Sequence, residues 1–147
     1  MIYYTYILAF GSNLGDREAN CLRGEQYLSK FGSILRISRH LHTEPLKSDK
    51  FQVEENQEYF LNYILEYRTT LAPLPLYEKI RIIEDELGHS RGSKKWASRF
   101  LDIDILELKR EEKLSFSEGG LHIPHPELQN RPFLLELLKD FDHLNYS

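Results

Sequence analysis

Apolar and polar residues alternate along three stretches of this sequence, a fourth stretch at its start is apolar and predicts a buried strand, and apolar residues recur every three or four positions along two others. Alternation is typical of strands with one buried face, and the longer spacing is typical of amphipathic helices. The strands are predicted at about residues 2–10, 34–42, 58–68 and 100–108, and the helices at about 16–31 and 75–87. Gly32 and Gly88 follow the two helices and are typical helix ends.

The order strand-helix-strand-strand-helix-strand is the split βαβ pattern of ferredoxin-like α+β folds. We therefore expect a βαββαβ core, in which an antiparallel sheet has its helices on one face and the other face is free to build a site. After this core, residues 111–120 indicate a turn or short hairpin, 121–126 a short extended piece and 132–138 a helix, which together form a C-terminal extension. Arg39 interrupts the apolar side of the second strand, which predicts that this strand lies at a sheet edge or frays there.

Two polar stretches, residues 43–57 and 89–98, have no periodicity. Irregular segments of this length within compact domains are often functional loops, and a tolerated surface insertion is the alternative for the first. A chain of 147 residues is long enough to bury a sizeable core. We expect residues 1–147 to form a single domain.

Composition and charge narrow the classes of function. With a net charge of −4, the chain offers no general surface for nucleic acid, and any phosphate binding must come from a local basic cluster. Cys21 is the single cysteine, so no disulfide forms within the chain. The apolar start lacks a basic n-region and is too short to span a bilayer. We expect a cytoplasmic monomer with no nucleic-acid or membrane partner.

The segment from Lys95 to Leu106 carries the strongest chemical signal. Asp102 and Asp104 alternate with aliphatic residues, so both carboxylates lie on one face of a predicted strand, with Cα atoms roughly 6.5 Å apart. Two carboxylates at this spacing repel each other unless a cation lies between them. Because lysines and arginines precede them, the segment is typical of a site in which carboxylates hold Mg²⁺ and cations hold phosphates. The solvated face of an ordinary amphipathic strand is the alternative.

Other segments could contribute to a site, and each also has a purely structural interpretation. The turn Gly11–Asp16 joins a strand to a helix N-terminus, which favours anions, but it could equally be an ordinary capped turn. Phe60 and Asn62 share a strand face and could hold a flat heterocycle, or belong to the core and the strand end. Glu84 could orient a ligand or pair with a basic side chain. His125, between two prolines, has a restricted backbone and could donate to a phosphate.

Taken together, these segments resemble the 6-hydroxymethyl-7,8-dihydropterin pyrophosphokinase family of folate biosynthesis, from Ile7 to about Leu138. The segments that carry the resemblance are Gly11–Asp16, Thr43–Leu46, Phe60–Asn62, Ile83–Arg91, Lys95–Leu106, Ile123–Pro126 and Arg131–Phe133. The resemblance implies an ATP- and Mg²⁺-dependent diphosphotransferase. Such an enzyme moves the terminal pyrophosphoryl unit of ATP to the hydroxymethyl oxygen of the pterin and releases AMP.

The resemblance also implies roles for individual residues. The ligands for two Mg²⁺ ions would be Asp102 and Asp104. The contacts to ATP would come from Glu84, Arg91, Lys95, Trp96, Arg99, Ile105, His125 and Arg131. The contacts to the pterin would come from Thr43, Pro45, Leu46, Phe60, Asn62 and Phe133, with the two phenylalanines on opposite sides of the ring. The residues expected to act in catalysis are Arg91, Lys95, Arg99, Asp102 and Asp104.

Two alternative interpretations share some of these sequence features. A two-metal nucleotidyltransferase also combines Gly-Ser with Asp-x-Asp, but it places the acidic pair close behind the Gly-Ser, whereas most of this chain lies between them. A non-catalytic relative that binds nucleotide or pterin is the second alternative. It is motivated by His89, which stands where arginine is common, and by the charged loop after Leu46. The presence of both aspartates, Arg91 and Arg99 argues against it.

Overall fold

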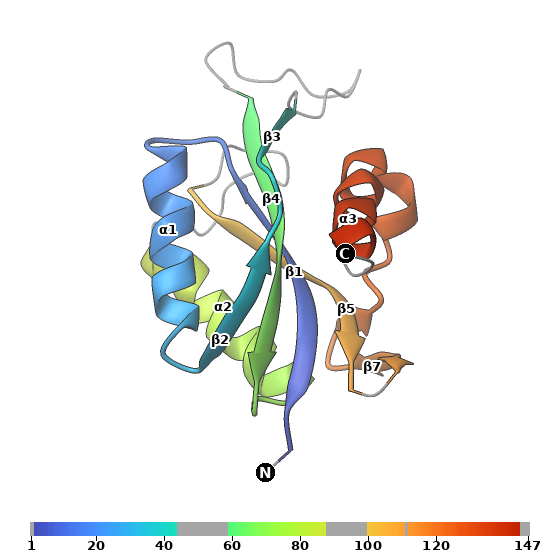
Figure 1. The fold of residues 1–147 in the computed structure, drawn as a ribbon. Coiled ribbons are helices and arrows are strands. Elements are labelled where there is room, and N and C mark those ends of the chain that lie inside the picture. Colours follow the sequence, from blue (N-terminus) through green and yellow to red (C-terminus); the bar gives the residue numbers. More distant parts are fainter. Residues whose placement is uncertain (1, 44–58, 88–99, 111, 145–147) are drawn as a thin grey trace.

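The structure is a computed structural model that describes residues 2–43, 59–87, 100–110 and 112–144, with the backbone alone for 142–144. Figure 1 shows a twisted sheet with helices on both of its faces. The elements in chain order are β1 (Tyr4–Ser12), α1 (Arg17–Leu28), β2 (Gly32–Ile37), β3 (Leu41–Thr43), β4 (Phe60–Thr69), α2 (Pro73–Glu86), β5 (Asp102–Lys109), β6 (Lys113–Leu114), β7 (Phe116–Glu118), β8 (Leu121–Ile123), the 3-10 helix η1 (Leu128–Asn130) and α3 (Pro132–Leu144).

Within the described residues, six strands form one antiparallel sheet in the order β2-β4-β1-β5-β6, and β3 continues the pairing along β4 beyond the end of β2. The strands β7 and β8 form a separate antiparallel pair. The predicted βαββαβ order and the ferredoxin-like α+β class are confirmed. The predicted C-terminal extension consists of the elements from β6 to α3.

The predicted second strand is split into β2 and β3, and Ser38 maintains the pairing with β4 at the break. The Ser38 amide donates to the carbonyl of Ile64, and the Ile64 amide donates to Ser38 Oγ, both at 2.9 Å. Arg39 leaves the sheet and pairs with Glu136 and Asp140 of α3 at 2.7 Å and 2.6 Å. The prediction of an edge strand that breaks at Arg39 is therefore confirmed.

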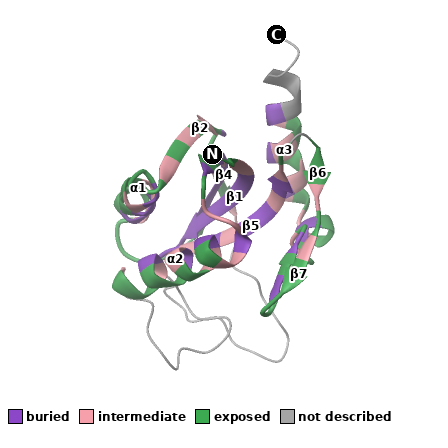
Figure 2. Ribbon diagram, turned by 90° about the horizontal axis from the view of Figure 1, so that it is seen from below, coloured by how far each residue is buried: buried purple, intermediate pink, exposed green. Residues whose placement is uncertain are grey.

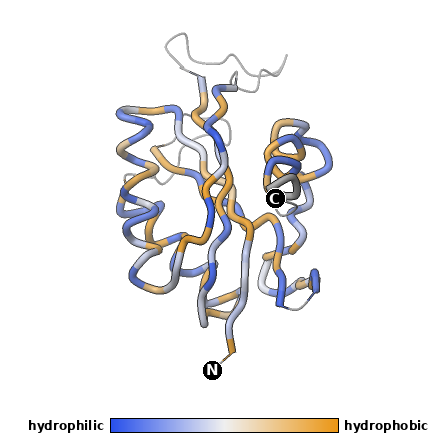
Figure 3. Tube along the Cα trace, viewed as in Figure 1, coloured by the Kyte–Doolittle hydropathy of each residue, from blue (hydrophilic) through white to orange (hydrophobic). Residues whose placement is uncertain are grey.

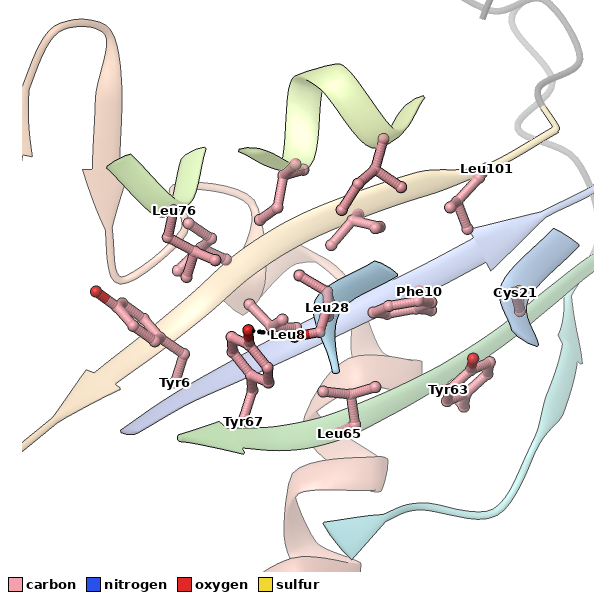
Figure 4. Close-up of a cluster of buried hydrophobic side chains, with 14 of the residues drawn as sticks. Tyr6, Leu8, Phe10, Cys21, Leu28, Tyr63, Leu65, Tyr67, Leu76 and Leu101 are labelled. Carbon is pink, nitrogen blue, oxygen red and sulfur yellow. Dashed lines mark hydrogen bonds between the residues drawn. The ribbon is translucent and has the colours of Figure 1, made fainter. Parts of the chain in front are cut away.

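Helices α1 and α2 cover one face of the sheet, and the larger core lies beneath them (Figures 1 and 2). Asp16 is the N-cap of α1, because its side chain accepts a hydrogen bond from the Ala19 amide at 3.1 Å. Within this core the Tyr67 hydroxyl donates to the carbonyl of Leu28 at 2.6 Å, so α1 is joined to β4 (Figure 4). Because the alternate residues of the central strands point into this core, their other side chains face the opposite side of the sheet.

Helix α3 covers part of that opposite face, which the sequence had left open for a site (Figure 1). A second, smaller core lies beneath it, made of Ile7, Ala9, Ile64, Leu106, Leu128, Leu134, Leu137 and Phe141. Arg36 of β2 helps to hold α3, because it pairs with Glu66 at 3.0 Å and donates to the carbonyl of Phe141 at 3.0 Å. Figure 3 shows hydrophobic and hydrophilic residues interspersed along the helices, as expected where one side of each helix is buried. None of the described helices is long and apolar enough to cross a membrane.

Candidate active site

The two aspartates of the acidic segment lie at the start of β5, on the face of the sheet that α3 partly covers. Asp102 and Asp104 are partly exposed, whereas Ile103 and Ile105 are buried in the core under α1 and α2. The alternation predicted for this segment is therefore confirmed. Both carboxylates share one face, and strand geometry sets their Cα atoms roughly 6.5 Å apart.

Small residues of β1 lie beside the two carboxylates. Asp102 pairs with Gly11, and Asp104 pairs with Ala9. On the other side of Gly11, the register brings Asn62 of β4 into the same row. Since glycine has no side chain and alanine has only a methyl group, a ligand over this part of β1 could reach Asp102 on one side and Asn62 on the other.

Asn62 is held in one orientation by β3 and by its own strand. Its Nδ2 donates to Thr43 Oγ1 at 2.5 Å and to the carbonyl of Phe60 at 3.3 Å. Its Oδ1 lies on the side of Gly11, because a Cβ atom added to Gly11 would be 3.2 Å from this oxygen and 3.9 Å from Phe60 Cδ1. An amide oxygen and an aromatic ring therefore border the space above Gly11.

Two basic side chains converge on Asp104 from the segment between β8 and α3. His125 Nε2 lies 3.7 Å from Asp104 Oδ1, and Arg131 Nη1 lies 3.7 Å from Asp104 Oδ2. All three side chains are partly exposed. Each distance is within ion-pair range but exceeds that of a direct hydrogen bond, so both basic groups are held beside the carboxylate without a direct hydrogen bond to it.

The position of His125 is fixed by its backbone and by one ring nitrogen. Its amide donates to the carbonyl of Leu106 at 3.0 Å, and its carbonyl accepts from the Leu128 amide at 3.0 Å. The Glu127 amide donates to His125 Nδ1 at 3.1 Å. Because Nδ1 acts as an acceptor, the neutral ring carries its proton on Nε2, the nitrogen that faces Asp104.

Glu84 of α2 contacts the acidic strand through its backbone. Its Oε2 accepts a hydrogen bond from the amide of Ile103 at 2.9 Å. Ile103 lies between the two aspartates, so a helix on one face of the sheet is joined to the strand whose carboxylates lie on the other. Hydrogen bonds with an ionised acceptor are about twice as strong as neutral ones, which makes this a firm attachment.

The donor set of β5 is compatible with Mg²⁺. Among the described residues, no group of three or more His, Cys, Asp and Glu side chains is arranged to hold a metal ion. Mg²⁺ bound with a polyphosphate nevertheless needs few protein ligands, because it keeps several waters and takes oxygens from the phosphates. Asp102 and Asp104, with Arg131 and His125 beside the second carboxylate, therefore fit a metal–phosphate site.

Comparison with known proteins gives this arrangement its context. Residues 7–143 match the family described as 7,8-dihydro-6-hydroxymethylpterin-pyrophosphokinase. A 2-amino-4-hydroxy-6-hydroxymethyldihydropteridine pyrophosphokinase of Aquifex aeolicus is 36% identical over 138 residues, which are 94% of this chain and 80% of that protein. The protein of the same name in Bacillus subtilis is 33% identical over 135 residues, 90% of this chain and 75% of that protein.

The chain belongs to this family. A folate synthesis bifunctional protein of Chlamydia trachomatis is 36% identical over 132 residues, which are 89% of this chain and 29% of that protein. A crystal structure of an HPPK-DHPS protein in complex with substrates has a TM-score of 0.64 and 17% identity, and it matches 93% of this chain and 40% of that chain. At this identity the likeness shows the fold alone. The chain spans less than half of these two longer proteins.

In this member of the pyrophosphokinase family, most of the predicted site residues that lie within the described part of the chain are on one face of the sheet. The acidic pair, His125 and Arg131 form one group, and Thr43, Phe60 and Asn62 form another. The side chain of Phe133 is half-buried against the second core, on the same face as Asn62. Ile105, predicted to lie near ATP, is 3% exposed in the core under α1 and α2.

Several predicted residues lie outside the described residues. They are the predicted catalytic and ATP-binding residues Arg91, Lys95, Trp96 and Arg99, and the predicted pterin-binding residues Pro45 and Leu46. Both irregular segments named from the sequence, 43–57 and 89–98, lie there too, apart from Thr43.

Two contacts that support the candidate site were not predicted. The first is the hydrogen bond from Ile103 to Glu84, which depends on how α2 lies against β5. The second is the close approach of α1 at Gly24, where an added Cβ atom would be 2.7 Å from Leu101 Cδ2 and 3.0 Å from Phe10 Cε2. The only signal in the sequence was a glycine in the middle of a predicted helix, which is unfavourable unless close packing requires it.

Proposed function

We propose that this protein transfers the terminal pyrophosphoryl group of ATP to the hydroxymethyl oxygen of 6-hydroxymethyl-7,8-dihydropterin, with Mg²⁺ as cofactor, as a step of folate biosynthesis. Membership of the family and the names of the relatives that span most of the chain support this activity. The observation that carries it is a pair of neighbouring rows of the sheet. Asp102, Gly11 and Asn62 lie in the first row, and Asp104 lies beside Ala9 in the second.

The part of the site around Asn62, in the first row, fits a pterin. Since Nδ2 is committed to Thr43 and to its own strand, Oδ1 is left to accept an N–H from the edge of a flat heterocycle. The ring of Phe60 borders the same space and could stack on that heterocycle. We place Phe133 on the opposite side of the pterin, because it lies on the same sheet face and is only half-buried.

The part of the site around Asp102 and Asp104 fits a metal-bound triphosphate. Asp102 and Asp104 would hold Mg²⁺, and a metal ion bound there neutralises phosphate charge as it develops. Arg131 and the protonated Nε2 of His125 face the same carboxylate and would donate to phosphate oxygens. The predicted basic residues Arg91, Lys95 and Arg99 would add to this cation set.

The reaction itself needs placement more than activation. The pterin hydroxyl oxygen forms a bond to the β-phosphorus, and the bond from that phosphorus to the oxygen bridging the α- and β-phosphates breaks. AMP leaves with the bridging oxygen, and the hydroxyl proton passes to solvent. Holding the attacking oxygen in line with the leaving oxygen supplies much of the rate. The neighbouring positions of Asn62 and the acidic pair in the sheet support binding of the two substrates side by side.

One assay tests this proposal. The protein is incubated with ATP, Mg²⁺ and 6-hydroxymethyl-7,8-dihydropterin, and AMP and the pterin diphosphate are quantified by chromatography. We expect both products in equal amounts, and neither with the Asp102→Ala variant. If the wild-type protein forms no more AMP than Asp102→Ala but still binds ATP or pterin, the non-catalytic relative is the correct alternative.

A further inference from the structure

The backbone of the acidic strand is held unevenly on its two edges. On one edge, β5 pairs with β1 from Asp102 to Lys109. On its other edge it pairs with β6 only at Leu108 and Lys109. Ile103, between the two aspartates, therefore has no strand neighbour on that second edge in the described part of the chain, and its amide is satisfied by the carboxylate of Glu84 at 2.9 Å.

The same short stretch is also held from the face of the sheet under the helices. Leu101 and Ile103 are 1% and 5% exposed, and both pack against α1 at Gly24. The apolar side chains, the pairing with β1 and the carboxylate of Glu84 thus fix this stretch from three different elements. The contact with Glu84 acts on the amide of Ile103, which belongs to the peptide that joins Asp102 to Ile103.

We propose that Glu84 is a positioning residue that holds the peptide between Asp102 and Asp104, so that both carboxylates keep the spacing required for metal-bound ATP. This inference rests on the proposed function. It differs from a direct contact between Glu84 and the nucleotide, because the effect of Glu84 on ATP passes through the amide of Ile103. Two carboxylates on one strand face repel each other, and an unanchored edge would let them move apart.

The consequence concerns metal-dependent binding. If Glu84 acts through the acidic pair, its loss weakens binding of Mg²⁺–ATP and leaves binding of metal-free ATP and of pterin unchanged. If Glu84 touches the nucleotide itself, its loss weakens ATP binding with and without metal. Glutamine at this position retains a carbonyl oxygen that can accept from the Ile103 amide, so it should preserve the positioning role.

The experiment compares Glu84→Ala, Glu84→Gln and a matched control, Glu78→Ala, which removes an exposed glutamate from the same helix. Calorimetry measures ATP binding with Mg²⁺ and in EDTA, and pterin binding is measured separately. For Glu84→Ala we expect Mg²⁺–ATP binding to weaken about tenfold, as is typical when a group that orients a metal ligand is removed. Metal-free ATP and pterin binding should match the wild type, Glu84→Gln should stay within about threefold, and Glu78→Ala should be unchanged.

A readout of the contact itself accompanies these measurements. The amide of Ile103 is followed by NMR, where loss of the carboxylate acceptor should move its proton signal upfield and speed its exchange with solvent. Both changes are expected in Glu84→Ala and neither in Glu78→Ala. Thermal unfolding shows that each variant is folded. If Glu84→Ala does not fold, Glu84→Gln decides: retained Mg²⁺–ATP binding with a protected Ile103 amide supports the proposal.

Three results would overturn the positioning role. They are an equal loss of ATP affinity with and without metal, a Glu84→Gln variant as weak as Glu84→Ala, and an Ile103 amide that is unchanged in Glu84→Ala. None of them depends on turnover. A wild-type protein that forms no AMP would contradict the proposed function, while the binding and NMR measurements would still test the contact.

Discussion

His125 Nε2 lies 3.7 Å from Asp104 Oδ1, and the same imidazole accepts a hydrogen bond from the Glu127 amide at its other nitrogen. Arg131 lies at the same distance from the second carboxylate oxygen. Asp104 therefore faces the guanidinium group of Arg131, which is always charged, and the imidazole of His125, which is charged only when both ring nitrogens carry a proton. It has no direct hydrogen bond to either group. This arrangement is suited to a ligand that carries both signs of charge, as a metal-bound triphosphate does.

The first prediction concerns the charge of Asp104. Asp104→Asn keeps the size of the side chain but removes the negative charge that attracts a divalent cation. We expect Mg²⁺–ATP binding to weaken by about tenfold or more, because a carbonyl oxygen is a much poorer ligand for Mg²⁺ than a carboxylate, and pterin binding to change little. Calorimetric titrations with each substrate measure the two affinities, with Asp85→Asn on the exposed side of α2 as the control. Equal losses for the two substrates would count against the assignment of Asp104 to the metal.

The second prediction concerns the orientation of Asn62. Thr43→Val keeps the shape of the side chain but removes the hydroxyl that accepts from Asn62 Nδ2 at 2.5 Å. The amide then loses one of its two anchors, and we expect pterin affinity to fall about fivefold, which is the typical net value of one hydrogen bond. Fluorescence titration with the pterin measures this change. The control Thr70→Val alters an exposed threonine just after the far end of β4, and it should bind pterin like the wild type. A Thr43→Val variant that loses ATP affinity instead would contradict the role of this pair.

The elements of the fold could be predicted from the sequence because burial on one side imposes a period. The alternation of Asp102 and Asp104 with aliphatic residues predicted a shared carboxylate face, and the structure confirms it. The break at Arg39 was predictable for the same reason, since a charged residue interrupts an apolar face. The position of α3 on the second face was not predicted, because a helical period indicates which side of a helix is buried but not which surface covers it.

Contacts that depend on the tertiary arrangement could likewise not be predicted from sequence patterns. Glu84 was expected near ATP or beside a basic side chain, and its bond to the amide of Ile103 requires knowing which edge of β5 lacks a strand neighbour. Thr43 and Asn62 were both assigned to the pterin, yet only the pairing of β3 with β4 shows that one orients the other. Sequence patterns identify the residue types of a site, and the register of the sheet determines which of them touch.

The third prediction concerns alkaline pH. Cys21 is 1% exposed, and burial raises the pKa of its thiol from 9.0 to about 12. Burial also raises the pKa of Tyr67 to about 12. Since the folded protein favours the neutral thiol and the unfolded chain does not, the contribution of Cys21 to stability is complete below pH 9.0 and declines as the pH rises toward 12.

Urea denaturation at pH 8 and pH 10 measures this decline. At pH 10 the ionisation of Cys21 in the unfolded chain should lower the free energy of unfolding by about 1.4 kcal/mol, one pH unit above the ordinary thiol pKa. Cys21→Ala removes this group but keeps Tyr67, so its stability should fall less between the two pH values. The same pH dependence in both proteins would show that the thiol ionises equally in the folded and unfolded states.

The fourth prediction concerns Gly24, where two opposing effects act on one substitution. Alanine favours a helix over glycine by about 1 kcal/mol, so Gly24→Ala would stabilise α1 if space allowed it. The added Cβ atom would lie 2.7 Å from Leu101 Cδ2 and 3.0 Å from Phe10 Cε2, and both residues are about 1% exposed in a packed core. Because overpacking a core costs typically about 1–3 kcal/mol, we expect a net loss of roughly 1–2 kcal/mol in the free energy of unfolding, measured by urea titration.

The control for Gly24→Ala is Gln26→Ala, at an exposed position of the same helix, which should be neutral or slightly stabilising in the same urea titrations. Leu101 directly precedes Asp102, so its displacement should also weaken Mg²⁺–ATP binding. A Gly24→Ala variant more stable than the wild type would mean that Leu101 and Phe10 can move aside, and that α1 does not fix the acidic strand.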